Sequence, residues 1–101
     1  MTSKKWVIRV VANAATGSEV NGVLYIKDIN VDAHDGRGSM DVTAETYHAV
    51  QFDSPGAAFQ YWMRQSKTRP IRADGKPNRP GTAYTIEVIT TAEARDLYQH
   101  R

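Results

Sequence analysis

The densest group of side chains able to bind a cation lies between residues 28 and 35. It combines carboxylate, amide and imidazole groups: Asp28, Asn30, Asp32, His34 and Asp35. The Asp-x-Asn-x-Asp spacing opens like a calcium-binding loop. Ala33 stands where that loop needs glycine, however, and Ser39 stands where it needs glutamate. The pattern therefore favours a solvated polar connection, because turns use the same residue types.

A metal-assisted hydrolase is the weakest of three functional hypotheses. It would combine Asp28, Asp32 and His34 with His48 from a separate segment. A triad assembled from Ser39, His48 and Asp41 lacks a strained nucleophile turn. Gly36-x-Gly38 lacks the spacing of a phosphate-binding motif. We therefore expect a protein that is not an enzyme, with no catalytic residues, no metal and no cofactor.

Positive charge is concentrated between residues 64 and 81, a segment that we call the basic loop. It holds one acidic residue, Asp74, and six cationic ones: Arg64, Lys67, Arg69, Arg72, Lys76 and Arg79. Its net charge is +5, whereas the whole chain carries +2. The rest of the chain is therefore net acidic, and the six cations are the predicted partner-binding residues.

The favoured hypothesis is a protein-binding module that uses the basic loop together with exposed edge-strand backbone. Arg69, Arg72 and Arg79 are the expected anchors, because guanidinium groups pair bidentately with carboxylates. The alternative is a small nucleic-acid-binding protein that uses the same loop, with Tyr61 or Trp62 stacking on bases. We rank it second because Trp62 lies on an apolar helical face and the remaining chain is acidic.

Length and composition indicate one ordinary globular domain. The chain has 101 residues, of which 41% are apolar and 24% charged, and it contains no cysteine. This size accommodates one modest core, so we expect a single domain over residues 1–101. No apolar run is long enough to span a membrane. We expect a cytoplasmic protein, as a monomer or a homodimer.

Alternating apolar residues predict the strands. Residues 6–12 alternate with apolar residues on both faces, which predicts a central strand. Residues 23–31 predict a second strand, paired with the first as an antiparallel hairpin. The glycine-rich segment 32–41 is expected to be a connection, followed by a strand within 42–52 that is clearest over 46–52. Val50 and Phe52 should face the core.

Helix signals follow this third strand. Ser54 and Pro55 predict a helix start, and Ala58, Phe59 and Trp62 give residues 54–66 one apolar face. Within the basic loop, Asp74-Gly75 predicts a tight turn. Residues 83–89 predict a last strand beside the first. Thr90 and Glu93 form a capping box that starts a short C-terminal helix.

These elements predict an α+β fold: an antiparallel sheet of three to four strands, with one main helix packed on one face and a short C-terminal helix. The order over residues 46–89, with Phe52-Asp53-Ser54-Pro55, then Ala58, Phe59 and Trp62, then Tyr84-Thr85-Ile86-Glu87-Val88, resembles small phage and prophage accessory proteins with a ββαβ core. Anti-CRISPR proteins are among them. The resemblance implies a non-enzymatic inhibitor of a bacterial defence (CRISPR-Cas) complex, acting in the cytoplasm of a bacterial host.

Overall fold

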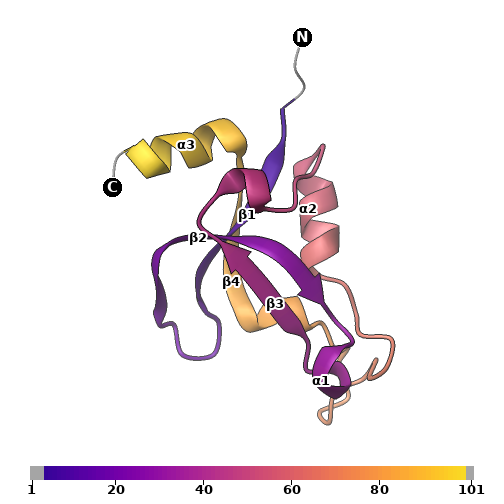
Figure 1. Ribbon diagram of the computed structural model, residues 1–101. Coiled ribbons are helices and arrows are strands. Elements are labelled where there is room, and N and C mark those ends of the chain that lie inside the picture. The colour runs from indigo at the N-terminus through magenta and orange to yellow at the C-terminus, as the bar shows by residue number, and fades with distance from the viewer. Residues whose placement is uncertain (1–3, 100–101) are drawn as a thin grey trace.

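The fold is a four-stranded antiparallel sheet with helices on both faces (Figure 1). The computed structural model describes residues 4–99. The strands are β1 (Trp6–Asn13), β2 (Glu19–Asn30), β3 (Ser39–Thr43) and β4 (Tyr84–Thr90), in the spatial order β3-β2-β1-β4. The predicted α+β class and antiparallel sheet are confirmed, as is the pairing of the last strand beside the first.

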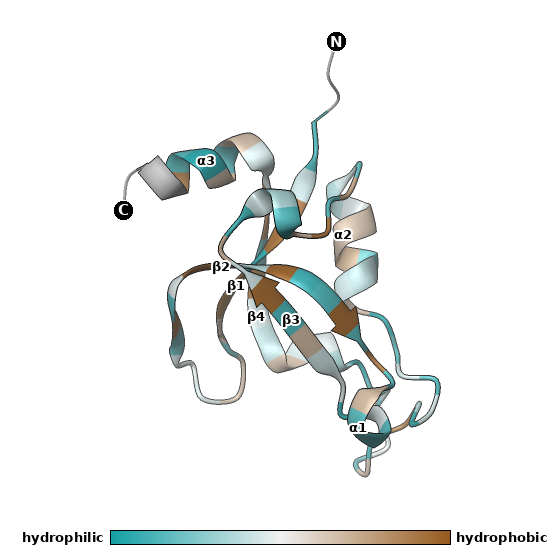
Figure 2. Ribbon diagram, in the orientation of Figure 1, coloured by the Kyte–Doolittle hydropathy of each residue, from teal (hydrophilic) through white to brown (hydrophobic). Residues whose placement is uncertain are grey.

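Strand β1 is central because both of its faces are apolar. Val7 and Ile8 point to opposite faces and are both fully buried. Val7 lies opposite Ile89 of β4, and Val10 lies opposite Leu24 of β2. Figure 2 shows hydrophobic stretches in the strands of the sheet. The predicted hairpin of the first two strands is confirmed, although β2 begins at Glu19, earlier than expected.

Each face of the sheet has its own helix and its own core cluster. Ala58 of α2 (Pro55–Trp62) is buried against Ile8 and Ile26 on one face. Ala94 of α3 (Thr91–Gln99) is buried with Val7 on the other. The expectation of one main helix is therefore corrected in part. The helix α3 is as long as α2, and it covers part of the second face.

The start of each of these two helices was predicted correctly. Ser54 caps α2 by accepting a hydrogen bond from the Ala57 N–H at 3.1 Å. At α3, Glu93 N–H donates to Thr90 Oγ1 at 3.1 Å, and the Glu93 carboxylate accepts from Thr90 in return. Helix α2 ends at Trp62, however, and not at residue 66. At this end of the helix, Gly81 packs directly against the Trp62 carbonyl, with no room for a Cβ.

The predicted third strand over 46–52 is wrong. Strand β3 occupies Ser39–Thr43, inside and just after the segment expected to be a connection. Residues Thr46–His48 form a short 3-10 helix, η1, and Phe52 makes only an isolated bridge with Trp6. The alternation in 46–52 has another cause. Val50 and Phe52 pack against the α2-side core, as expected, whereas Ala49 is buried on the α3 side.

Three short elements complete the structure. Residues Ala33–Gly36, labelled α1, form a tight turn in which His34 and Asp35 have left-handed backbone angles, with φ of 53° and 59°. A second 3-10 helix, η2, spans Pro80–Ala83 and leads into β4. The Asp74-Gly75 turn is confirmed, because the Arg72 N–H donates to the Lys76 carbonyl at 2.8 Å and closes a small hairpin.

Candidate functional site

The basic loop is tied to the body of the protein by Asp32. The Asp32 carboxylate accepts hydrogen bonds from the Lys67 N–H at 2.6 Å, the Thr68 N–H at 3.1 Å and the Ser66 hydroxyl at 3.0 Å. These bonds, led by those from the backbone of Thr68 and Lys67, hold the pKa of Asp32 below its usual value of 3.8. Asp32, which was predicted as a potential cation ligand, therefore orders the basic loop.

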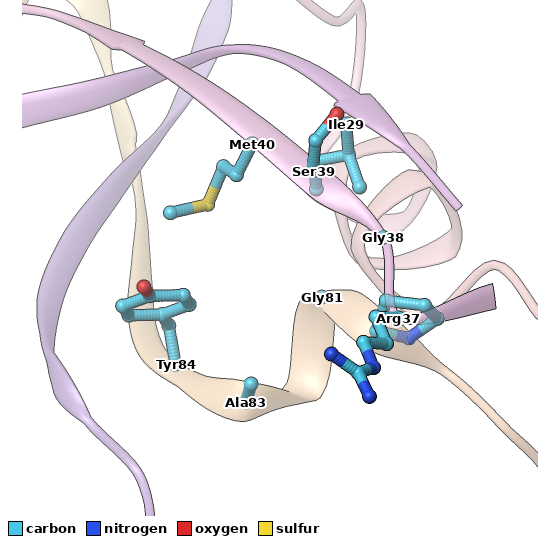
Figure 3. A pocket seen from close by; sticks show the side chains of 9 residues that line it. Ile29, Arg37, Gly38, Ser39, Met40, Gly81, Ala83 and Tyr84 are labelled. Carbon is cyan, nitrogen blue, oxygen red and sulfur yellow. The ribbon is translucent and has the colours of Figure 1, made fainter. Parts of the chain in front are cut away.

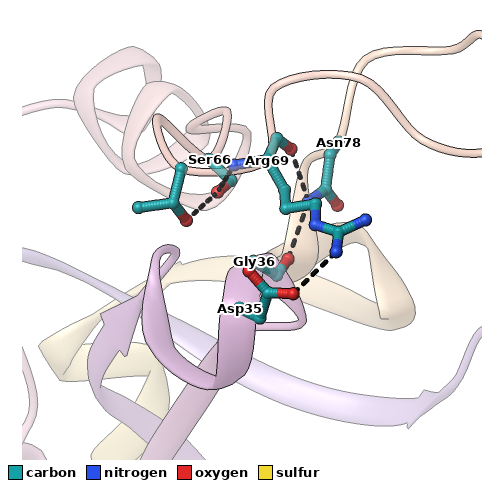
Figure 4. Close-up of polar contacts among 6 residues, drawn as sticks. Asp35, Gly36, Ser66, Arg69 and Asn78 are labelled. Carbon is teal, nitrogen blue, oxygen red and sulfur yellow. Dashed lines mark hydrogen bonds and ion pairs between the residues drawn. The ribbon is translucent and has the colours of Figure 1, made fainter.

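Asn78 provides a second anchor for the basic loop. Its side-chain amide donates to the Gly36 carbonyl at 2.7 Å and to the Arg69 carbonyl at 2.8 Å (Figure 4). Gly36 has φ of 85°, and a Cβ there would lie 2.3 Å from the Arg69 Cβ. Only glycine fits this contact. The turn after β2 and the basic loop therefore form one packed unit, which we call the basic lobe (residues 32–38 and 64–81).

The six predicted cations divide into two groups. Arg64 contacts the body of the protein: its guanidinium donates to the Ile29 carbonyl and lies 4.0 Å from the centre of the Tyr61 ring, although the residue stays exposed. Arg69 pairs with Asp35 at 2.7 Å, and Arg72 pairs with Asp74 at 2.9 Å. The remaining three, Lys67, Lys76 and Arg79, have no such partner among the described side chains. The basic loop is therefore partly neutralised by the chain itself.

Three arginines nevertheless line one open groove. Arg72 and Arg79 come from the basic loop, and Arg37 comes from the turn before β3. The groove has a volume of about 510 Å³, and its remaining polar lining is Asn13, Asn78 and Thr82. No carboxylate lines it among the described residues. We call it the arginine groove.

Arg37 was not among the predicted partner-binding residues, and in the structure it lines the arginine groove. Arg37 also lines two neighbouring hollows, one beside Ile29 and Met40 and one beside Arg69 and Ile71. The available signal was its position between Gly36 and Gly38, both of which have left-handed φ angles. These glycines create a sharp turn that presents the intervening side chain.

A smaller pocket adjoins the arginine groove on the α2 side of the sheet. Its volume is about 260 Å³, and its walls include Ile29, Met40, Pro80 and Tyr84. Figure 3 shows the Met40 side chain and the Tyr84 ring at one end of the pocket, and the Arg37 guanidinium at the other. We call it the Met40 pocket. Arg37, Pro80 and Ala83 line both cavities, so the pocket and the groove share part of one wall.

The predicted cation-binding residues of segment 28–35 do not form a metal site in the part of the chain that the structure describes. The Asp28 carboxylate accepts a hydrogen bond from the Tyr61 hydroxyl at 3.1 Å, and the Asn30 side chain accepts one from the Asp32 N–H. His48 lies in η1, within a separate segment. No group of three or more His, Asp or Glu side chains positioned to hold a metal is found among residues 4–99.

The two aromatic side chains considered for base stacking are used inside the fold. The Trp62 indole N–H donates to the Gly81 carbonyl at 2.6 Å. The Tyr61 hydroxyl accepts from the Ile29 N–H at 2.9 Å, and burial raises its pKa. Arg64 covers the Tyr61 ring. Both rings are therefore partly buried and contribute to the packing of the fold.

Comparison of this chain with protein-family models, curated proteins and solved structures finds no match. The part of the chain that the structure describes contains no helix with the length and hydrophobicity needed to cross a membrane. Function must therefore be argued from the chemistry of the basic lobe itself.

Proposed function

We propose that this protein is a non-enzymatic binding module that captures an acidic segment of a partner protein in the arginine groove. The observation that supports this function is that Arg37, Arg72 and Arg79 line one groove whose described lining contains no carboxylate. Arg72 is paired with Asp74 outside that lining, so Arg37 and Arg79 supply the charge without an acidic partner. Guanidinium groups form bidentate, charge-assisted hydrogen bonds with carboxylates. A string of carboxylates is the complementary ligand.

The arginine groove is prepared for this contact in two ways. Arg37 and Arg79 have no acidic partner among the described side chains, so their donors remain available to a ligand. Asp32 and Asn78 hold the backbone of the basic lobe in place. A preorganised site loses less conformational entropy when a partner binds.

A protein partner fits the surface better than a nucleic acid does. Tyr61 and Trp62, the two aromatic side chains proposed to stack on bases, are engaged within the fold. The chain outside the basic loop is net acidic. This charge disfavours a nucleic acid that binds over a broad surface, but not an acidic peptide confined to the groove. Nucleic-acid binding is therefore the alternative outcome of the experiment below.

The resemblance to phage accessory proteins supports a narrower form of the proposal, in which the partner belongs to a bacterial defence complex. The strand-to-helix join at Phe52 that suggested this resemblance is not a strand end in the structure, because Phe52 makes only an isolated bridge. The binding proposal therefore depends on the arginine groove and not on the resemblance.

The test is fluorescence anisotropy with a labelled oligoglutamate peptide and a labelled single-stranded oligonucleotide of equal charge, at physiological ionic strength. We expect the peptide to bind the wild-type protein more tightly than the oligonucleotide does. The double substitution Arg37→Glu and Arg79→Glu should weaken peptide binding by about a hundredfold. The matched control is Lys27→Glu with Arg95→Glu, because these exposed residues do not line the arginine groove.

Three results would overturn the proposal. The first is an absence of peptide binding, and the second is an equal loss in the control variant, which would show that net charge alone attracts the peptide. The third is tighter binding of the oligonucleotide with a steep salt dependence, which would assign the groove to nucleic acid.

A further inference from the structure

We infer that the captured acidic segment carries one large apolar side chain, which enters the Met40 pocket while neighbouring carboxylates bind the arginine groove. This inference rests on the proposed function and specifies the ligand further. It follows from the size of the Met40 pocket, its lining and the wall that it shares with the groove.

The residues that line the Met40 pocket are suited to contact with a hydrophobic side chain. Ile29, Met40, Pro80 and Tyr84 supply apolar walls, and among the described residues its polar side chains are Arg37, Ser39 and the Tyr84 hydroxyl. Met40 and Tyr84 are only half-buried, so part of their apolar surface is left uncovered by the fold. Methionine adapts its shape to different partners, and the tyrosine ring offers a flat apolar face.

The volume of the Met40 pocket limits what can enter it. At about 260 Å³ it falls below the range of roughly 300–1,000 Å³ typical of pockets that bury a whole small molecule. It is suited to one large side chain of a longer ligand. An extended peptide supplies such a side chain, and its remaining residues continue along the surface.

Arg37 couples the two parts of the ligand. Its side chain lines the Met40 pocket at the end opposite Met40 and Tyr84, and it also lines the arginine groove (Figure 3). A carboxylate bound by Arg37 must therefore lie close to the group that fills the pocket. This arrangement selects a short motif in which an aromatic or large aliphatic residue is flanked by Glu or Asp.

The experiment compares two labelled peptides: a phenylalanine flanked on both sides by glutamates, and the same peptide with serine in place of phenylalanine. Burial of the ring should make the phenylalanine peptide bind at least about tenfold more tightly. Equal affinities would overturn the inference and leave the proposed function standing. Failure of both peptides to bind would overturn the proposed function and this inference with it.

Two variants that fill the Met40 pocket test its location. Ser39→Leu and Ser39→Phe each add an apolar side chain at an exposed residue of the pocket wall that does not line the arginine groove, and Ala92→Leu is the control at an exposed position on α3. The filled variants should remove the advantage of the phenylalanine peptide and leave serine-peptide affinity unchanged. Retention of the advantage in both variants, with wild-type melting temperatures, would overturn the inference.

Discussion

The carboxylate of Asp32 accepts a hydrogen bond from the backbone N–H of Lys67 at 2.6 Å, which joins the turn after β2 to the start of the basic loop. The same carboxylate oxygen accepts from the Thr68 N–H and the Ser66 hydroxyl. The basic lobe is therefore assembled around one ionised side chain, and its integrity depends on the charge of that side chain.

Acid should loosen the basic lobe. Hydrogen bonds hold the pKa of Asp32 below 3.8 in the folded state, so its contribution to stability is present above that value and is lost as the pH falls through the lower folded pKa. We expect Asp32→Asn to lower the melting temperature at neutral pH. The difference from wild type should shrink in strong acid. A difference that is constant across pH would contradict this role of the charge.

The Trp62 ring should contribute more to stability than its neighbour Phe59. Trp62 is half-buried against the sheet and donates its indole N–H to Gly81, whereas Phe59 is 44% exposed. We expect Trp62→Ala to cost about 3 kcal/mol of unfolding free energy and Phe59→Ala about 1 kcal/mol, measured by urea denaturation. Equal costs would mean that the contact with Gly81 contributes nothing.

Backbone strain at His34 offers a stabilising substitution. His34 has φ of 53°, a left-handed conformation that costs a non-glycine residue about 1 kcal/mol. His34→Gly should therefore raise the unfolding free energy by up to about 1 kcal/mol. His34→Ala is the control, because alanine retains the strain and should give no gain. Equal gains in both variants would assign the effect to loss of the imidazole.

Arg64 should act on stability and not on binding. Its guanidinium donates to the Ile29 carbonyl and lies over the Tyr61 ring, away from the arginine groove. Arg64→Met should cost about 1–2 kcal/mol and leave the affinity for the oligoglutamate peptide within about twofold of wild type. Lys67→Met removes the same charge from a side chain without an acidic partner, so it should cost less than about 0.5 kcal/mol. A large loss of affinity for Arg64→Met alone would place Arg64 in the binding surface.

Local signals in the sequence determined much of the scaffold. The alternation in residues 6–12, the Ser54-Pro55 helix start and the Thr90–Glu93 capping box each depend on neighbours within a few residues, so they could be interpreted without the fold. The concentration of positive charge in residues 64–81 is also a property of the sequence. These features identified an α+β domain that carries a basic loop.

The third strand and the candidate site were decided by tertiary contacts. An alternating segment such as 46–52 can form a strand, or it can pack between two core clusters without pairing as a strand. Only the tertiary contacts of Ala49, Val50 and Phe52 show which of these two structures it adopts. Likewise, composition counts the charges of the basic loop but not the directions in which their side chains point. Arg64 is held by its hydrogen bond to the Ile29 carbonyl. Arg37 instead joins Arg79 from a segment distant in sequence, because Gly36 and Asn78 bring the two segments into contact.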